Sequence, residues 1–262
     1  MPWYLYLAFK QLFPGGRFPF FTLMSMLGVT LGVAVLVVTT GVMDGFGNQI
    51  KKMTVDTQGD VQVSGENAFA NVAEIENLVA GVPGVIAATP FARGVVLLEH
   101  GGRKPAYPGI EGIDINRVRG VVPLDRYIHG GSIDQLDDDS IILSVQLAKS
   151  LGARLGDKVE VYSPLIIEKL KRDEIFLPRE LRVVALFEFG HQALDSSLVL
   201  TTLRTMQDLY GLQGAVHGLN LKIAPGADAD AVAARLNAVL PRAAQLRARS
   251  WIELNREFLF II

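Results

Sequence analysis

The stretch FPFFTLMSMLGVTLGVAVLVVTTGVM, from Phe18 to Met43, decides the architecture of this chain because it contains no charged residue. A helix needs about 20 apolar residues to cross the hydrocarbon core of a bilayer, so this stretch can span it with some tilt. It is longer than the core of a cleaved signal peptide, about 7–15 residues, and no small-x-small cleavage site ends it. The sequence therefore predicts an uncleaved transmembrane helix over residues 17–45.

The residues before this helix predict another contact with the membrane. Trp3–Lys10 is aromatic and apolar with one cation, and Pro14-Gly15-Gly16 follows it. Aromatic side chains favour the headgroup region, so we expect residues 1–16 to form an interfacial helix on the cytoplasmic side. Cations flank the span equally, at Lys10 and Arg17 before it and at Lys51 and Lys52 after it. The short N-terminal flank then decides the orientation, and it places the downstream domain outside the cytoplasm.

Two features concern neighbouring helices. Gly28 and Gly32 form a GxxxG pair, which either lets another helix approach closely or is merely tolerated by the membrane. At the other end of the chain, the apolar run Glu257–Ile262 follows Trp251. It resembles the entry to a second span, the alternative being the end of a hydrophobic strand or helix. We expect residues 255–262 to be the truncated start of transmembrane helix 2.

Composition excludes several classes of function. Hydrophobic residues make up 50% of the 262 positions and the mean hydropathy is +0.31, an excess concentrated before Met43. The net charge of -2 gives no sign of a nucleic-acid partner, which needs a basic surface. With no cysteine, the chain has no disulfide, thiolate metal site or cysteine nucleophile. The remaining residues are numerous enough to bury a sizeable core.

Residues 46–254 predict an α+β domain, because short apolar strands and capped helices interleave without a steady βαβ rhythm. The strands are predicted at Asp60–Ser64, Gly94–Glu99, Ser140–Leu143, Lys158–Tyr162, Leu181–Phe189, Ser197–Thr201 and Gly218–Ile223. The helices are predicted after the caps Asn71, Ser144, Thr202 and Asp228 or Asp230, ending at Gly81, Gly152, Gly211 and Pro241. The predicted fold class is thus a membrane-anchored α+β protein with one N-terminal transmembrane helix.

One segment interrupts this pattern. Ser163–Arg179 separates two predicted strands by far more than the 2–5 residues of an ordinary hairpin loop. Apolar residues lie near both of its ends, and the charges in its middle cancel. A protruding loop of this kind indicates a partner-binding arm, the alternative being a two-strand extension packed on the domain.

The sequence carries no motif that predicts catalysis, a metal or a cofactor. The four histidines lack metal-ligand spacing, and each is interpreted as a surface or turn residue. Asp137-Asp138-Asp139 lacks the spacing and the glycine of a calcium loop, which favours a solvated turn. GxSxG, SxxK and Walker A motifs are absent from the sequence. We therefore predict no catalytic, cofactor-binding or metal-binding residues.

Six stretches together resemble the lipoprotein-releasing ABC permeases of the LolC/LolE type, within the wider group of MacB and FtsX. They are YLAFKQLFPGGRFPFFTLMSMLGVTLGVAVLVVTTGVMDGF, PGVIAATPFARGVVLL, GIEGID at Gly109–Asp114, LGARLGDKVEVYSP at Leu151–Pro164, PRELRVVALFEFG at Pro178–Gly190, and SWIELNREFLF at Ser250–Phe260. The resemblance covers nearly the whole chain.

The resemblance implies a MacB-like periplasmic domain followed by further spans, so that this chain is the N-terminal portion of a multi-pass inner-membrane permease. It implies a complex with a separate ABC ATPase subunit, a second permease subunit, a lipoprotein substrate and a periplasmic lipoprotein carrier. It also implies that ATP hydrolysis takes place in the partner chain. The permease itself is then not an enzyme.

The resemblance also implies a role for the arm, residues 163–179. Residues 163–179 lie where LolC-type members carry a loop that docks on the carrier, although charges fill Glu168–Glu174 here. The implied apolar contacts are Pro164, Leu165, Ile166, Phe176, Leu177 and Pro178.

An acylated lipoprotein substrate, which the resemblance implies, would need lipid contacts, and we expect these on the first transmembrane helix. Moving a lipid chain from membrane to water costs about 0.8 kcal/mol per CH₂, so acylated cargo needs both energy and an apolar shelter. We expect Phe21, Met24, Val29 and Val33 to contact the acyl chains, the alternative being ordinary lipid or internal packing.

The sequence is also compatible with two other functions. One is a MacB-type exporter subunit, which moves small molecules or peptides and lacks the docking loop. The other is an FtsX-like regulator, which transmits force to a cell-wall hydrolase without transporting anything.

Overall fold

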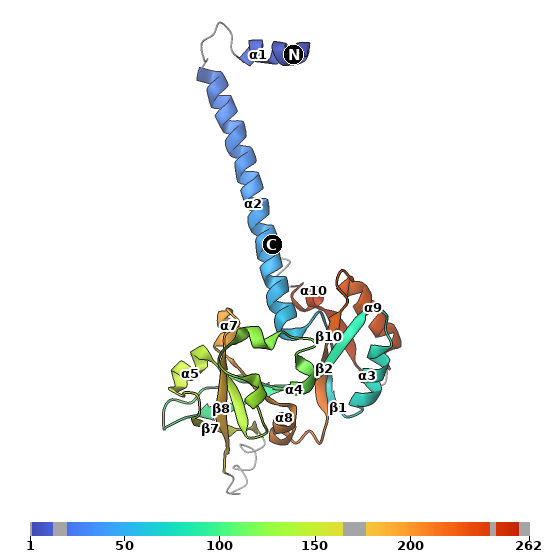
Figure 1. The fold of residues 1–262 in the computed structure, drawn as a ribbon. Helices are drawn as coiled ribbons and strands as arrows, with labels where there is room; N and C mark the ends of the chain where they lie inside the picture. Colours follow the sequence, from blue (N-terminus) through green and yellow to red (C-terminus); the bar gives the residue numbers. More distant parts are fainter. Residues whose placement is uncertain (1, 13–19, 165–176, 242–244, 257–262) are drawn as a thin grey trace. The chain divides into compact units, whose positions relative to one another are not determined.

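The computed structural model describes residues 2–12, 20–164, 177–241 and 245–256. They fall into two units, one up to Ile50 and one from Lys51 onward. Figure 1 shows the elements along the chain. The first unit holds α1, Trp3–Leu12, and most of α2, Phe20–Gln58.

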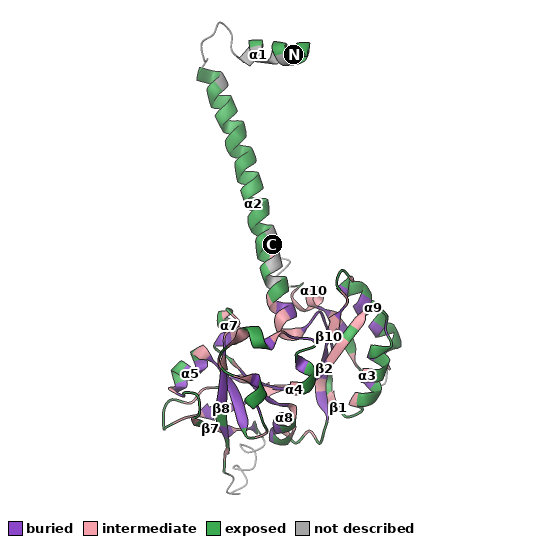
Figure 2. Cartoon of the chain, viewed as in Figure 1, coloured by how far each residue is buried: buried purple, intermediate pink, exposed green. Residues whose placement is uncertain are grey.

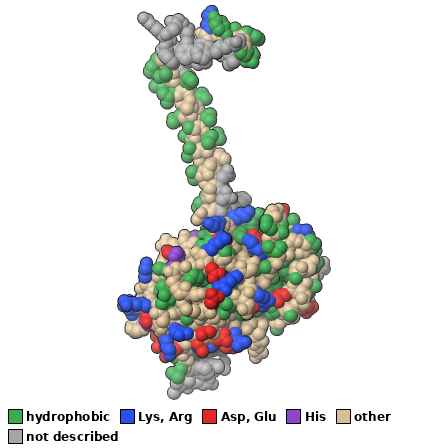
Figure 3. All heavy atoms as spheres, viewed as in Figure 1, with side chains coloured by type: hydrophobic (Ala, Val, Ile, Leu, Met, Phe, Trp, Pro, Cys, Tyr) green, Lys and Arg blue, Asp and Glu red, His purple; other side chains and the backbone are tan. Residues whose placement is uncertain are grey.

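Helix α2 has the character that its sequence predicts. In the part of the chain that the structure describes, it is the one helix long and apolar enough to cross a membrane, with a mean hydropathy of 2.2. Its side chains are exposed over the apolar length (Figure 2), and hydrophobic side chains follow it (Figure 3). The hydroxyl groups of Thr30, Thr39 and Thr40 donate to carbonyl oxygens one turn earlier, at 2.7, 2.8 and 2.9 Å. These polar groups are therefore satisfied within the helix itself, as a hydrocarbon environment requires.

Helix α2 continues beyond residue 45, where the sequence predicts its end. It reaches Gln58, and its last turns from Lys51 onward belong to the second unit. Thr54 and Val55 are buried there, and the Tyr127 hydroxyl donates to Asp56 Oδ2 at 2.5 Å. Burial, followed by this hydrogen bond, raises the pKa of Tyr127 to about 12. Loss of apolar character at Met43 marks the end of the predicted span, but it does not end the helix.

The second unit is an α+β domain, as predicted, and its sheet is mixed. The strand order is β11-β1-β10-β2-β4-β9-β6-β8-β7-β3, with β5 paired to β8. The β4–β9 and β6–β8 pairs are parallel and the other pairs are antiparallel. The strands are β1 Val61–Phe69, β2 Val85–Val95, β3 Leu97–Glu99, β4 Gly109–Ile113, β5 Ile128–Gly131, β6 Ser140–Ser144, β7 Lys158–Tyr162, β8 Arg179–Phe187, β9 Leu198–Thr202, β10 Val216–Ile223 and β11 Arg247–Ser250.

Short helices lie between these strands or follow the last of them. They are α3 Val72–Ala80, α4 Ile115–Val118, α5 Val145–Leu151, α7 Gln192–Asp195, α8 Leu203–Tyr210, α9 Ala229–Val239 and α10 Trp251–Leu254, with the 3-10 helices η2 Leu124–Tyr127 and η3 Ile133–Gln135. The predicted caps Ser144, Thr202 and Asp228 each accept a backbone N–H through their side chains. Asn71 precedes α3 as predicted, but its amide donates to Glu74 at 3.1 Å and accepts no backbone N–H.

Three apolar clusters hold the sheet. Helices α3 and α9 cover β1, β10 and β11 at one end, where they lie close together in Figure 1. At the other end both faces of β6 are buried: Ile141 and Leu143 join a cluster with α5 and α8, whereas Ile142 joins one with η2 and η3. Alternate residues of a strand point to opposite faces of the sheet. Because both faces of β6 are covered, its sequence contains consecutive apolar residues.

Candidate functional site

The predicted arm leaves the sheet between β7 and β8. These strands pair antiparallel, with Val161 opposite Arg179, so the hairpin brings the two ends of the arm together. Leu165, Ile166 and Phe176, three of the six predicted contact residues, lie outside the described residues. Pro164 is exposed, Pro178 is half-buried, and Leu177 is 81% exposed. A leucine this exposed offers apolar surface beside a rigid sheet.

Two glutamates face each other across the strands at the root of the arm. Glu160 lies opposite Glu180, a like-charge pair that destabilises a sheet unless it is compensated. The Lys158 ammonium donates to Glu180 at 2.8 Å, which raises the pKa of Lys158. The Tyr162 hydroxyl donates to Glu160 at 2.9 Å, and this hydrogen bond raises the pKa of Tyr162. Each carboxylate therefore has its own donor, so the two strands remain paired where the arm begins.

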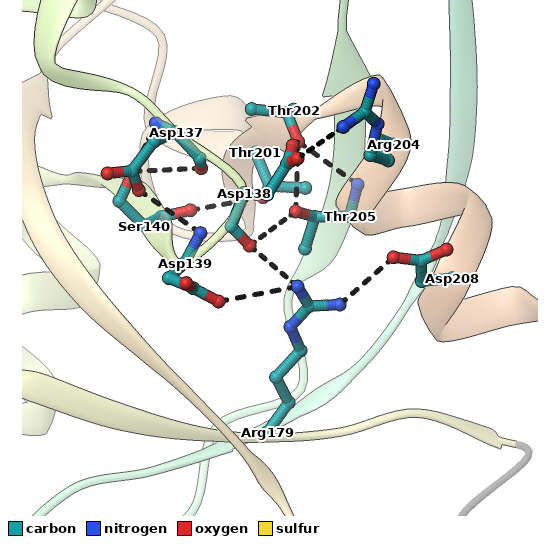
Figure 4. Close-up of polar contacts among 10 residues, drawn as sticks. All are labelled: Asp137, Asp138, Asp139, Ser140, Arg179, Thr201, Thr202, Arg204, Thr205 and Asp208. Carbon is teal, nitrogen blue, oxygen red and sulfur yellow. Dashed lines mark hydrogen bonds and ion pairs between the residues drawn. The ribbon is translucent and has the colours of Figure 1, made fainter.

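Arg179, the first residue of β8, ties the arm's return strand to two other elements (Figure 4). Its Nη2 donates to the Asp138 carbonyl oxygen at 2.8 Å and lies 3.6 Å from Asp139 Oδ1. Its Nη1 lies 3.5 Å from Asp208 Oδ2 on α8. One guanidinium thus connects β8, the loop before β6 and helix α8.

The acidic loop before β6 has more structure than the predicted solvated turn. The Asp138 carboxylate accepts from the Thr202 hydroxyl at 2.6 Å, and the Thr205 hydroxyl donates to the Asp138 carbonyl at 2.7 Å (Figure 4). Asp137 and Asp139 remain largely exposed. The residues of this network are far apart in the chain, which explains why no local pattern predicts it.

Replacing Arg179 by alanine is expected to lower the free energy of unfolding by about 1–2 kcal/mol, because it removes charge-assisted contacts from a group that is only 28% exposed. Arg204 is the matched control. It is 77% exposed and reaches Asp138 only at 3.3 Å, so Arg204→Ala is expected to cost about 0.5 kcal/mol or less. Thermal unfolding of the full-length protein in nanodiscs measures both. Equal losses would contradict the role given to Arg179.

The four predicted lipid contacts are all exposed on α2. Phe21, Met24, Val29 and Val33 are available to lipid or to another chain. At about 3.6 residues per turn, however, they are spread over roughly half of the helix circumference, so they do not form one narrow stripe. Gly28 and Gly32 have open space where a Cβ would lie. These assignments stay predictions.

Two of the histidines contact backbone groups of the sheet. His100 contacts the Lys158 carbonyl at 2.9 Å, and His217 accepts the Arg93 N–H at 3.1 Å. Burial and the nearby Arg93 lower the pKa of His217. In residues 2–12, 20–164, 177–241 and 245–256 no cluster of three or more His, Cys, Asp or Glu is placed to hold a metal ion.

Residues 22–239 match the family described as the MacB-like periplasmic core domain. The chain belongs to this family. The match includes strands β1 to β10 of the sheet, helices α3 to α9 and the two strands that carry the arm, whereas β11 lies beyond it. The fold agrees, because the periplasmic region of MacB from Actinobacillus actinomycetemcomitans superimposes with a TM-score of 0.52 at 14% identity, over 79% of this chain and 95% of that one. The extracellular domain of the noncanonic ABC-type transporter YknZ from Gram-positive bacteria gives 0.51 at 13% identity, over 72% and 99%.

Curated relatives lie within the LolC group of this family. The lipoprotein-releasing system transmembrane protein LolC of Neisseria meningitidis is 29% identical over 93% of this chain and 59% of its own length. LolC of Xylella fastidiosa strain Temecula1 is 31% identical over 79% of this chain and 50% of its own length. The predicted resemblance to LolC-type permeases is confirmed, and the chain spans about half the length of these curated relatives.

Proposed function

We propose that this chain is the N-terminal portion of a permease subunit in an ABC complex that extracts lipoproteins from the inner membrane and passes them to a periplasmic carrier. In this proposal the domain from Lys51 onward is periplasmic, α1 lies along the cytoplasmic surface, and α2 spans the membrane. A separate ATPase subunit binds and hydrolyses ATP, and a second permease subunit, identical or homologous, completes the complex.

The observation that carries the proposal is the exposed, apolar end of the arm at Leu177 on a stabilised hairpin. Leu177 is 81% exposed, whereas two residues later Arg179 is held by the contacts to the acidic loop and α8. A surface group on a rigid support loses little conformational entropy when a partner covers it, which favours binding. The similarity to LolC relatives supports a carrier as that partner.

A photo-crosslinking amino acid at Leu177 in the full-length protein, expressed in its native cell, tests this function. We expect capture of a periplasmic lipoprotein carrier, identified by mass spectrometry. The control places the same amino acid at Leu155, a surface turn residue that is 44% exposed, where no carrier should be captured.

The other outcomes are informative. Capture of an outer-membrane tunnel protein would support a MacB-type exporter, and capture of a cell-wall hydrolase would support an FtsX-like regulator. Crosslinks only to the permease's own domain would return residues 163–179 to a structural extension. Each of these three results would overturn the proposed carrier contact.

A further inference from the structure

A cavity of about 340 Å³ lies within the domain, away from the arm. Its walls come from the end of α2, from β2, β4, β9 and β10, and from the segments around α4 and α7. Small-molecule sites in proteins usually measure about 300–1,000 Å³, so this cavity is large enough for a ligand. Apolar side chains form most of its lining, among them Phe91, Ile110, Val122, Phe189, Leu198 and Leu200.

The charged groups of the cavity cancel each other. Arg93 Nε lies 2.7 Å from Glu111 Oε2, and the guanidinium is 4.2 Å from the centre of the Phe91 ring. Glu111 is buried. An added ion would find no uncompensated opposite charge in this pair and would lose its hydration, so the cavity disfavours charged ligands.

Polar groups remain that a neutral ligand head can contact. Thr89 lines the cavity, and its buried hydroxyl has no hydrogen-bond partner among the described residues. Gln58, at the end of α2, also lines it. Asn220 is already bonded to Gln62 at 2.9 Å. A buried hydroxyl usually has a partner, so one that lacks it indicates a place for a hydrogen-bonding ligand atom.

We propose that this cavity binds a neutral amphiphile, a single hydrocarbon chain that ends in a hydroxyl, ester or amide. The hydrocarbon chain lies against Phe91, Leu198 and their apolar neighbours, where it is removed from water. The head accepts from or donates to the hydroxyl of Thr89. This site is formed by the domain, which includes the last turns of α2, and not by the apolar part of that helix, so it goes beyond the proposed transport function and does not depend on it.

The test uses full-length protein in nanodiscs and a diazirine-bearing hexadecanol as the probe. After irradiation, mass spectrometry locates the labelled peptides. We expect label on β4, β9 and the segment before β9, and at least a tenfold loss of that label when unlabelled hexadecanol competes. Leu198→Trp, which fills the cavity, should cause a similar loss. Leu155→Trp, at the surface turn, should leave labelling unchanged.

Three results would overturn the proposal. The first is label confined to the part of α2 before Lys51, which would show only the lipid environment. The second is labelling of the cavity peptides that neither the competitor nor Leu198→Trp reduces. The third is equal labelling by diazirine-bearing palmitate, whose carboxylate is charged. The competition experiment uses the unchanged protein, so it decides the question even if Leu198→Trp fails to fold. A failure of lipoprotein release would not affect any of these readouts.

Discussion

Under the proposed function, Leu177→Asp in the full-length protein is expected to weaken binding of a periplasmic lipoprotein carrier at least tenfold, about 1.4 kcal/mol or more. Leu177 is 81% exposed at the end of the arm, and a partner that covers it removes its apolar surface from water. Aspartate would lose this gain and would also place a carboxylate in the contact, which must then be dehydrated. Surface plasmon resonance between purified carrier and nanodisc-embedded permease measures the change.

The matched control is Leu155→Asp. Leu155 is an exposed leucine in the turn before β7, and it carries no part of the arm. Its replacement should change the affinity for the carrier less than twofold, and both variants should unfold within a few degrees of the unchanged protein. If Leu177→Asp binds the carrier as tightly as Leu155→Asp does, Leu177 is not a contact residue. If the proposed function is correct, release of lipoprotein from proteoliposomes should fall in parallel with affinity, because the proposed transfer to a carrier uses this contact.

Local signals in the sequence predict much of this fold. Ser144 and Thr202 each precede a short helix that a glycine ends, and both side chains accept a backbone N–H at 3.1 Å in the structure. Such caps depend on residues three positions apart, so a single sequence displays them. The strand predicted at Lys158–Tyr162 is β7 with the same bounds, because alternating apolar residues identify it.

Strand β4 shows what local patterns miss. GIEGI at Gly109–Ile113 contains two glycines, which favour a turn, and the pattern predicts no strand there. The structure explains Gly112: a Cβ at this position would lie 2.4 Å from Met206 Cβ, so only glycine lets α8 approach β4 so closely. This requirement arises from packing between elements far apart in the chain. Local sequence patterns also fail to predict the parallel pairing of β6 with β8, because these strands are far apart in the chain.

In the candidate site, too, local sequence predicts one feature, the arm, and misses another, the contacts at its root. The unusual length of residues 163–179 predicts an arm, because a loop length is read directly from the sequence. The contacts that hold its root are not predicted, since Arg179 and Asp138 are separated by 41 positions. An acidic run without ligand spacing indicates a solvated turn, and nothing in it identifies the arginine and the two threonines, Thr202 and Thr205, that contact Asp138.

The junction between α2 and β1 gives the largest expected effect on stability. Gly59 follows the last residue of α2 with φ +78°, and its N–H donates to the Val55 carbonyl at 3.0 Å. A Cβ at Gly59 would lie 2.7 Å from the Leu221 carbonyl oxygen, a backbone atom of β10 that cannot move alone. Asp60 follows directly, and its backbone carbonyl accepts the Trp251 N–H at 3.0 Å. Asp60, two residues after the end of α2, is therefore hydrogen-bonded to the first residue of α10.

We expect Gly59→Ala to lower the free energy of unfolding by about 3 kcal/mol or more, because left-handed backbone strain and a steric overlap act together. For a domain of this size that corresponds to a fall in Tm of roughly 6–12 °C. Gly156→Ala separates the two causes. Gly156 has φ +89° and open space where its Cβ would lie, so this variant should lose only the strain, about 1–2 kcal/mol.

Thermal unfolding of the full-length protein in nanodiscs, followed by circular dichroism, compares these variants. Equal falls in Tm would show that β10 yields to the new Cβ and that the junction is not tightly packed. A larger fall for Gly59→Ala would instead show that the new Cβ overlaps with β10 and that the junction is tightly packed.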